Sequence, residues 1–412
     1  MKHSVHLTLF EARRFLLLKH GLLGEWRFAG KAGAYAFVRQ AGCIQFDPVD
    51  ACGRNAELTL FSRVKGCKRS DLFDLLYRDR TLFDYADKEL SVIPTEDWPC
   101  FSHIRRRCIE QGKQFEGLQE AEAFALDYIR AHGPVRSDTL PLDGELFWHS
   151  SMHWSGNRHG KSAAARSVLE QLYSSGVLVV CRKEGTRKVY DLAERCIPKA
   201  LLDASDPFSD EKERIAWQVL RRIGATGLLP ARRSDAYLGV WNLDAKGRDA
   251  AFSRLLAEGR ILPVSIEGLS EELYCRAEDR PLLARAMGSE RFAPRCAFLA
   301  PLDPLLWDRR LIGKLFGFSY TWEIYTPPQK RRFGAYVLPI LYGERFVGRI
   351  EPVADRANGV LTVKNVWLED DVKPTARLRA AIGTEARRLM RFNGCKTLAF
   401  SDTNGFVTVE KC

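Results

Sequence analysis

Helical patterns dominate the first part of the chain. Thr8 and Glu11 form a capping-box pattern in front of a segment with helical apolar periodicity, and Gly21 provides a C-cap. We therefore predict a helix between these signals, and a second helix over residues 33–41. The stretch CIQFDPVD that follows must leave helical geometry, because Pro48 disfavours the α region for the residue before it.

An internal repeat reveals the organisation of the middle of the chain. Residues 161–192 and 247–275 share one layout, in which an amphipathic helix ends in Ser-Gly or Glu-Gly. An apolar strand, a polar turn and a second strand then follow in both copies. A weaker third copy runs over residues 70–94.

Two further helical patterns separated by a short turn precede each of the two clear copies. They cover residues 120–133 and 135–142 before the first copy, and 211–224 and 228–239 before the second. Three helices and a β-hairpin in this order are typical of the winged helix-turn-helix, whose third helix can enter a DNA groove. Helix-plus-hairpin units also recur by chance in α+β proteins, so a second signal is needed.

The tips of the two hairpins differ in charge. The first, RKEGTRKV, carries Arg187 and Lys188, as a wing that contacts phosphates would. The second, SIEGLSEE, is acidic, and we predict that it packs against protein.

Strand patterns replace helical ones toward the C-terminus. Residues 337–368 alternate apolar and polar positions, interrupted by Tyr-Gly-Glu and by Asn358-Gly359, a strong hairpin signal. They predict a β-meander or small barrel, closed by a helix over residues 375–394 and a strand over 396–401. The fold class is therefore α+β, with tandem winged helices and a C-terminal β-barrel or meander. The predicted domains are residues 1–118, 119–200, 201–293 and 294–412.

Length and charge agree with several domains and a polyanionic partner. The 412 residues exceed one ordinary domain, and 63 basic against 52 acidic side chains give a formal net charge of +11. This excess alone leaves nucleic acid, an anionic membrane and acidic substrates open. No apolar run approaches a membrane span or a signal-peptide core, and the 11 scattered cysteines form no Cys-x-x-Cys pair. We expect a cytoplasmic protein without membrane contact.

Several kinds of chemistry lack their usual motif. The sequence has no Gly-rich phosphate loop and no Gly-x-Ser-x-Gly elbow, which argues against nucleotide hydrolysis and esterase activity. Two weak metal patterns lack a matched second pair of ligands, so we predict no metal and no cofactor. These patterns are His149, His153 and His159, and Cys100, His103 and Cys108.

One polar pair stands out in the apolar stretch before Pro48. Gln45 and Asp47 are two residues apart, so in an extended segment both side chains project from the same side. Such a pair can orient a water, and the carboxylate can face a transient cation. The commoner arrangement for an Asp-Pro sequence is a turn in which Gln45 satisfies nearby backbone groups, and the residues alone leave both possibilities open.

A family resemblance bears on this choice. The stretches GCIQFDPVDACGRNAELTLFSRV, GTRKVYDL and FLAPLDPLLWDRRLIGKLFGFSYTWEIYTPPQKRRFGAYVLPILYGERFVGRIEP resemble the bacterial winged-helix DNA glycosylases of the YcaQ/AlkZ type, which unhook interstrand crosslinks. The resemblance covers nearly the whole chain, in the same order. It implies tandem winged helices with a β-barrel, and cleavage of the N-glycosidic bond of N7-alkylated purines.

The family's catalytic motif is a Gln, an apolar residue, then Gln or Asp. It corresponds here to Gln45, Phe46 and Asp47, the Asp-bearing form associated with broader specificity. The resemblance implies that Asp47 stabilises the sugar cation and that Gln45 positions the water. No Schiff-base lysine is implied, so we expect a monofunctional enzyme that leaves an abasic site.

One segment departs from the family pattern. Where the family usually has Trp and His in YW-x-HE, this chain reads YADKEL, with Ala86 and Lys88 at those places and Glu89 retained. Lys88 and Glu89 remain candidates for lesion contact. Lys88 would place a fixed cation against an already cationic base, which affects the substrate range.

The DNA-binding candidates are basic residues spread along the chain. The turn QKRRFG is exposed by its composition, and its cations are predicted to meet phosphates, although a solvated surface patch is the alternative. The full set is Arg54, Arg63, Lys161, Arg187, Lys188, Lys330, Arg331 and Arg332.

Two other functional classes compete with the glycosylase. A non-catalytic winged-helix DNA-binding protein or transcription regulator would use Gln45 and Asp47 structurally, and an RNA-processing factor would rest on charge alone. For the glycosylase we expect a monomer that acts on double-stranded DNA with alkylated purines or crosslinks, in the bacterial cytoplasm and at the nucleoid when bound. The physiological alkylating agent, the preference for crosslinks or monoadducts and the groove entered are not encoded in any motif.

Overall fold

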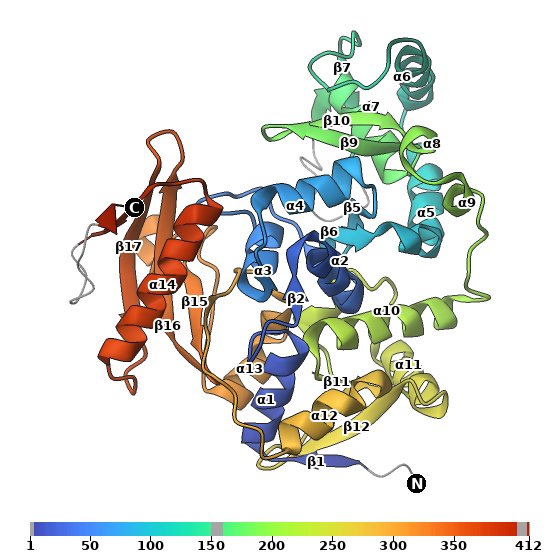
Figure 1. The fold of residues 1–412 in the computed structure, drawn as a ribbon. Helices are drawn as coiled ribbons and strands as arrows, with labels where there is room; N and C mark the ends of the chain where they lie inside the picture. The colour runs from blue at the N-terminus through green and yellow to red at the C-terminus, as the bar shows by residue number, and fades with distance from the viewer. Residues whose placement is uncertain (1–3, 150–159, 402–409, 412) are drawn as a thin grey trace. The chain divides into compact units, whose positions relative to one another are not determined.

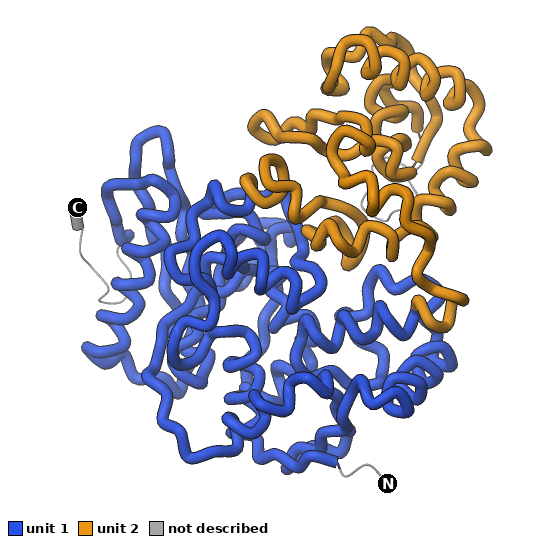
Figure 2. Tube along the Cα trace, turned by 45° about the vertical axis from the view of Figure 1, so that its right-hand side comes forward, with its two compact units in different colours: residues 1–72, 215–412 blue, residues 73–214 orange. Residues whose placement is uncertain are grey.

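The chain forms two compact units in the computed structural model, which describes residues 4–149, 160–401 and 410–411. Unit 1 comprises residues 1–72 and 215–412, and unit 2 comprises residues 73–214. Figure 1 shows the elements in chain order, and Figure 2 colours the two units. The chain passes from unit 1 to unit 2 within helix α4 (Arg69–Phe73) and returns within α10 (Glu211–Thr226).

The first two helices of unit 1 confirm the local sequence signals. In α1 (Leu9–Lys19), the backbone N–H of Glu11 donates to the Thr8 hydroxyl at 3.2 Å, and the Thr8 N–H donates to the Glu11 carboxylate at 2.7 Å. This reciprocal capping box satisfies two N–H groups that a helix start otherwise leaves unpaired. The second helix, α2 (Gly30–Ala41), begins three residues before the predicted start at Gly33 and ends at the predicted residue.

Both clear repeat copies contain the predicted helix and hairpin. In unit 2, α7 (Ala164–Ser174) precedes β9 (Leu178–Glu184) and β10 (Arg187–Leu192). In unit 1, α11 (Ala245–Ala257) precedes β12 (Ile261–Ile266) and β13 (Leu273–Arg276). The weaker third copy also ends in an antiparallel hairpin, β5 (Leu82–Asp87) with β6 (Glu89–Pro94).

The middle helix of each copy was predicted wrongly. Residues 135–142 form turns, and Val135 makes an isolated bridge to Tyr190. Residues 228–239 contain only β11 (Leu229–Pro230), which pairs with β13, and a short 3-10 turn. Each segment contains a proline that interrupts helical hydrogen bonding, and pairing with the hairpin supplies the extended backbone with partners instead.

Unit 1 contains two larger sheets. One has the strand order β1-β12-β13-β11, in which β1 (Val5–Leu7) runs parallel to β12 and covers its edge. The other has the order β14-β15-β16-β17-β18-β19, so the predicted meander is confirmed. Helix α14 (Ala376–Phe392) packs on a face of this second sheet (Figure 1). The strands β14 to β19 of this six-stranded sheet are Cys296–Phe298, Leu338–Tyr342, Arg345–Asp355, Val360–Leu368, Thr397–Phe400 and Glu410–Lys411.

The remaining elements are short or connect these parts. The α-helices are α3 (Asn55–Arg63), α5 (Ser102–Gly112), α6 (Leu118–His132), α8 (Ala193–Cys196), α9 (Lys199–Leu202), α12 (Arg280–Met287) and α13 (Arg309–Phe316). The strands are β2 (Phe28–Ala29), β3 (Ile44–Gln45), β4 (Val64–Lys65), β7 (Glu145–Phe147) and β8 (Lys161–Ala163). The π and 3-10 turns are η1 (Asp74–Arg78), η2 (Thr95–Phe101), η3 (Asp235–Tyr237), η4 (Ala277–Asp279), η5 (Pro304–Leu306) and η6 (Pro328–Lys330).

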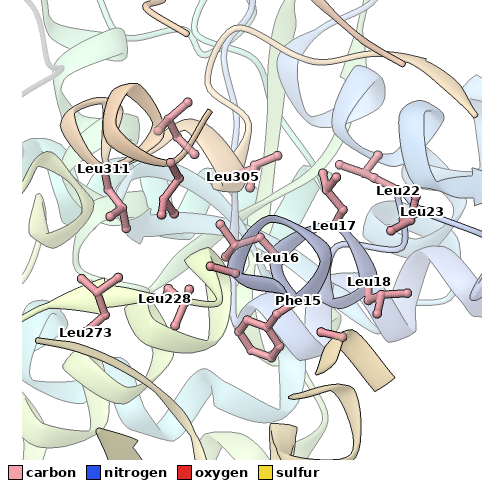
Figure 3. Packing of buried hydrophobic residues seen from close by; sticks show 14 of the residues in the cluster. Phe15, Leu16, Leu17, Leu18, Leu22, Leu23, Leu228, Leu273, Leu305 and Leu311 are labelled. Carbon is pink, nitrogen blue, oxygen red and sulfur yellow. The ribbon is translucent and has the colours of Figure 1, made fainter. Parts of the chain in front are cut away.

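Helices α1 and α3 lie at the centre of two hydrophobic clusters in unit 1. The first cluster packs Phe15 and Leu16 of α1 against Leu228, Leu273 and Leu305 (Figure 3). The second includes Leu58 and Phe61 of α3 together with the six-stranded sheet and α14. Removal of this apolar surface from water is the main force that holds α1, α3 and the meander together.

A buried ion pair fixes the end of α3. The Arg63 guanidinium donates to both carboxylate oxygens of Asp303, at 2.9 and 2.8 Å, and both side chains are 0% exposed. Arg63 Nε also donates to the carbonyl of His20 at 3.2 Å, at the end of α1. Removing one partner would leave the other charge buried and uncompensated.

We predict that Asp303→Ala lowers the unfolding free energy of unit 1 by about 3–5 kcal/mol, because Arg63 would stay buried without its counter-ion. The measurement is chemical denaturation followed by circular dichroism. Asp371→Ala is the matched control, since Asp371 pairs with Arg345 at the surface, with side chains 75% and 53% exposed, and should leave the midpoint nearly unchanged. Equal effects of the two variants would contradict this role of Asp303.

Candidate active site

Gln45 is held in place through its backbone. It ends the short strand β3 and is 8% exposed, and its carbonyl accepts a hydrogen bond from Asn55 Nδ2 at 2.7 Å. The other side of the same amide, Asn55 Oδ1, accepts from the N–H of Leu302 at 2.8 Å. Asn55 therefore connects the Gln45 backbone to the segment that contains Asp303.

Asp47 combines a turn with a chemically available carboxylate. Its Oδ1 accepts a hydrogen bond from the N–H of Val49 at 2.9 Å, which is the turn that the Asp-Pro sequence favours. Burial raises the pKa of Asp47 above its ordinary value, and the hydrogen bond from Val49 opposes that effect. A raised pKa makes this carboxylate a stronger base than an aspartate in water.

Asp50, three residues later, has the opposite electrostatic environment. Its carboxylate accepts from Arg69 Nη2 at 2.6 Å, Arg356 Nη2 at 2.5 Å and the N–H of Gly53 at 2.9 Å. Burial acts to raise the pKa of Asp50, but the two arginines outweigh it and hold the pKa below its ordinary value. Environments that shift the pKa values of two neighbouring carboxylates in opposite directions are a feature of active sites. Of these two carboxylates, Asp47 is the one with the raised pKa and is therefore the stronger base.

The segment after Asp47 is tied to the meander and to α14. Asn393 Nδ2 donates to the carbonyl of Cys52, the hydroxyl of Tyr336 donates to the carbonyl of Gly53, and the N–H of Ala354 donates to the carbonyl of Ala51, each at 2.8 Å. These bonds reach the segment from several elements of unit 1. Asp47 therefore projects from a fixed backbone, as a catalytic group requires.

The segment before Gln45 is fixed by a close arginine. Gly42 has φ +77°, and a Cβ there would lie 2.7 Å from Arg221 Nε. Arg221 Nη2 donates to the carbonyl of Gly42 at 2.5 Å. Only glycine accommodates both the left-handed backbone and this approach.

Two tyrosines share the electrostatic environment of Asp47. Burial and then the charges of Cys52 and Asp47 raise the pKa of Tyr336, whose hydroxyl also contacts Gly53. Desolvation and the charge of Asp47 raise the pKa of Tyr325. Both tyrosines, one buried and one exposed, are therefore close enough to Asp47 to interact with its charge, which composition and spacing do not indicate.

The predicted DNA-binding arginines of α3 take different places. Arg63 is fully buried against Asp303, so it has a structural role in place of the predicted phosphate contact. Arg54, at the start of the helix, bonds to the Glu57 carboxylate through its backbone N–H at 2.8 Å and its Nη1 at 3.3 Å. Its side chain is 12% exposed.

The basic hairpin tip of unit 2 is already paired within the protein. Arg187 Nη1 donates to Asp138 at 2.6 Å, and Lys188 Nζ donates to Glu170 at 2.8 Å. Lys161 lies exposed in β8. A phosphate would have to compete with the carboxylates for Arg187 and Lys188, so their contact with DNA stays a prediction.

The basic turn of unit 1 contains both outward and inward cations. Lys330 and Arg332 are exposed, and Arg332 lies over the ring of Phe333. Arg331 instead turns into its own loop, where Nε donates to the carbonyl of Thr326 at 2.8 Å. The turn therefore offers two cations to a phosphate backbone and uses the third for its own structure.

The two lesion-contact candidates lie at the tip of the β5–β6 hairpin in unit 2. Lys88 is 5% exposed, and its carbonyl accepts from the Ser91 hydroxyl at 3.0 Å. Glu89 has φ +55°, an unusual backbone for a side chain of its size. Contact of either residue with a lesion stays a prediction.

The described part of the chain shows neither a metal cluster nor a membrane helix. No group of three His, Cys, Asp or Glu side chains there could hold a metal ion. His153 and His159 of the weak metal pattern lie outside the described residues. Among the described helices, none has both the length and the apolar character needed to span a bilayer.

Comparison with known proteins identifies the family. The model of the AlkZ-like DNA glycosylase family matches residues 38–392, so the chain belongs to this family of DNA glycosylases. The structure of DNA glycosylase AlkZ from Streptomyces sahachiroi is similar over 98% of this chain and 100% of that chain, with a TM-score of 0.61 and 18% sequence identity. That likeness shows a shared mixed α and β fold.

Family membership separates the competing functional classes. The protein is a DNA glycosylase with a role in DNA repair, and its substrate is DNA. The alternatives of a non-catalytic regulator and an RNA-processing factor are therefore set aside. The matched range begins seven residues before Gln45 and includes Asp47, Tyr325 and the basic turn.

We predict that Asp47→Asn raises the melting temperature at neutral pH. The folded-state pKa of Asp47 lies above its unfolded value, so ionisation opposes folding at pH values above that range, and the amide removes the penalty. The amide oxygen still accepts from Val49. The gain should shrink as the pH falls through the raised folded pKa and should vanish below the ordinary value of 3.8, where both states of the wild-type protein are protonated.

The control for this prediction is Asp50→Asn, assayed by the same thermal melts over a pH series. Asp50 has a lowered pKa, so its charge stabilises the fold above the unfolded pKa and loses this effect as the pH falls through the folded pKa. Its variant should melt below the wild type at neutral pH. A melting temperature for Asp47→Asn below that of the wild type would show that ionisation of Asp47 does not destabilise the folded state.

Proposed function

We propose that this DNA glycosylase hydrolyses the N-glycosidic bond of N7-alkylated purines, with Asp47 and Gln45 as its catalytic residues. The observation that carries the proposal is the contrast between Asp47, whose pKa is raised in a fixed segment, and Asp50, whose charge is neutralised by two arginines. The Asp47 carboxylate is available for chemistry, whereas that of Asp50 is occupied.

The chemistry of the lesion matches a site with one base and no separate acid. An N7-alkylated purine already carries a positive charge, so the base can depart without protonation. The sugar then develops oxocarbenium character, which a carboxylate stabilises. Asp47 also accepts the proton of the water that attacks C1′, so the N-glycosidic electrons leave with the base and the product is an abasic site.

Gln45 serves as the residue that orients this water. Its backbone is fixed by Asn55, so its amide group starts from a defined position. Because no lysine nucleophile is part of this scheme, the enzyme is monofunctional. Asn55 acts on the reaction only through the position of Gln45.

The finer features of the fold and partner are part of the same proposal. The helix-and-hairpin units at residues 161–192 and 247–275 act as winged helices, and the domains are residues 1–118, 119–200, 201–293 and 294–412. A crosslinked base stays tethered to the opposite strand, so unhooking requires an open basic surface instead of a closed pocket. Lys88 and Glu89 then contact the lesion, and the enzyme acts as a monomer.

Asp47→Asn should keep DNA affinity and lose most base release, because it removes the charge and little else. Positioned acid-base groups typically contribute about 10²–10⁴-fold to the rate. The assay follows release of N7-methylguanine from duplex DNA, with alkaline cleavage of the abasic product. Gln45→Ala is the comparison and should be less severe; wild-type release by Asp47→Asn would remove Asp47 from the reaction.

The basic turn provides a separate prediction about binding. Replacing Lys330 and Arg332 with Gln should weaken binding to damaged and undamaged duplex alike, and flatten the plot of log affinity against log salt by roughly 0.9 per lost phosphate contact. Fluorescence anisotropy at several salt concentrations measures the slope. Arg331→Gln is tested separately, because Arg331 holds its own loop. An unchanged slope would exclude this turn from the DNA interface.

A further inference from the structure

Tyr325 is an exposed aromatic side chain that is linked through two further aromatic rings to the segment of the proposed catalytic carboxylate. It is 80% exposed, the most exposed of the large apolar side chains in the described part of the chain. Exposure of a whole aromatic ring gives no folding energy, because the ring stays in water. A role in packing therefore does not explain Tyr325, and a role in recognition is the physical alternative.

The loop that presents Tyr325 is built to keep its shape. The guanidinium of Arg331 donates to the carbonyls on both sides of this tyrosine, at 3.4 Å to Ile324 and 2.8 Å to Thr326. The carboxylate of Glu323 accepts from three successive N–H groups, those of Arg332, Phe333 and Gly334, at 2.9, 2.9 and 3.2 Å. Tyr325 thus stands on a preorganised turn, which lowers the entropy lost on binding.

A row of aromatic rings connects Tyr325 to the segment that contains Asp47. The Trp322 ring lies 5.7 Å from the Tyr325 ring and 6.0 Å from the Tyr336 ring, each in an edge-to-face arrangement. The Tyr336 hydroxyl donates to the carbonyl of Gly53, six residues after Asp47. The charge of Asp47 contributes to the raised pKa of both tyrosines, after the larger effect of desolvation.

We infer that Tyr325 stacks on a nucleobase that has left the helical stack next to the deoxyribose on which Asp47 acts. An aromatic ring offers every base a π-face, and stacking of this kind tolerates any sequence. The exposed Lys330 and Arg332 of the same loop meet the flanking phosphates. The inference rests on the proposed function, and it adds a residue that holds the damaged strand open while the sugar reacts.

The kinetic test compares Tyr325→Ala, Tyr325→Phe and Tyr325→Trp in release of N7-methylguanine from duplex DNA. Loss of a stacked base should lower kcat/KM about 5- to 150-fold in the alanine variant, whereas phenylalanine and tryptophan should restore most of the activity. Phe10→Ala is the matched control, since Phe10 is an exposed aromatic residue of the same unit and should change nothing. Equal loss in the phenylalanine variant would assign the effect to the hydroxyl and overturn the stacking role.

The binding test is independent of the lesion and uses the Asp47→Asn protein. Anisotropy compares a duplex that contains one unpaired nucleotide with the fully paired duplex. The parent protein should prefer the unpaired nucleotide, and Tyr325→Ala should lose this preference while keeping its affinity for paired DNA and its melting temperature. Absence of a preference in the parent protein, or its survival in the alanine variant, would overturn the inference. Failure of wild-type protein to release N7-methylguanine would instead overturn the proposed substrate, and this binding test would still decide the role of Tyr325.

Discussion

The buried pair between Arg63 and Asp303 is the interaction on which the candidate site depends. Both charges are fully removed from water, so each is stable there only because the other is present. Helix α3 has nine residues, and Asn55 at its other end binds the Gln45 carbonyl and the N–H of Leu302. Both ends of α3 are thus anchored to the segment around residues 302–303. The position of Gln45 follows from a core ion pair that takes no part in the chemistry.

Charge pairing also distinguishes Asp47 from Asp50, whose pKa values are shifted in opposite directions. The two residues are only three positions apart. The Asp50 carboxylate accepts from Arg69 and Arg356, whereas the Asp47 carboxylate accepts from the backbone N–H of Val49. The two arginines hold the Asp50 carboxylate in its loop, whereas the partly desolvated Asp47 carboxylate accepts a hydrogen bond from the Val49 N–H and has a raised pKa, which suits it to the proposed role of base. An arginine beside Asp47 would stabilise its ionised form and lower its pKa, which would make it a weaker base. Stability and the proposed catalysis therefore make opposite demands on neighbouring positions of one segment.

The sequence predicts the elements that depend on local signals, but not the side-chain contacts between residues far apart in the chain. The Thr8 capping box and the Asn358-Gly359 hairpin depend on residues close in sequence, so α1 and the meander were predicted. The burial of Arg63 could not be predicted from the sequence, because its partner Asp303 lies 240 residues away. The predicted middle helices do not form, because each segment contains a proline and pairs with its own hairpin. Burial and pairing of charges are properties of the tertiary fold, which composition does not contain.

In the loop that contains Tyr325, the positions of the side chains cannot be predicted from the charges in the sequence. The sequence TPPQKRRFG indicates three equivalent cations, but in the folded chain Arg331 turns inward to hold two carbonyls, and the aromatic ring between those carbonyls turns outward. This inverts the usual arrangement, in which charge faces water and rings are buried. Two hydrogen bonds donated by Arg331 and three accepted by the Glu323 carboxylate maintain this inverted arrangement, so the loop has a defined shape. Because a row of aromatic rings links Tyr325 to the segment of Asp47, the proposed base, a nucleobase of the reacting strand is the planar ligand whose chemistry fits both groups.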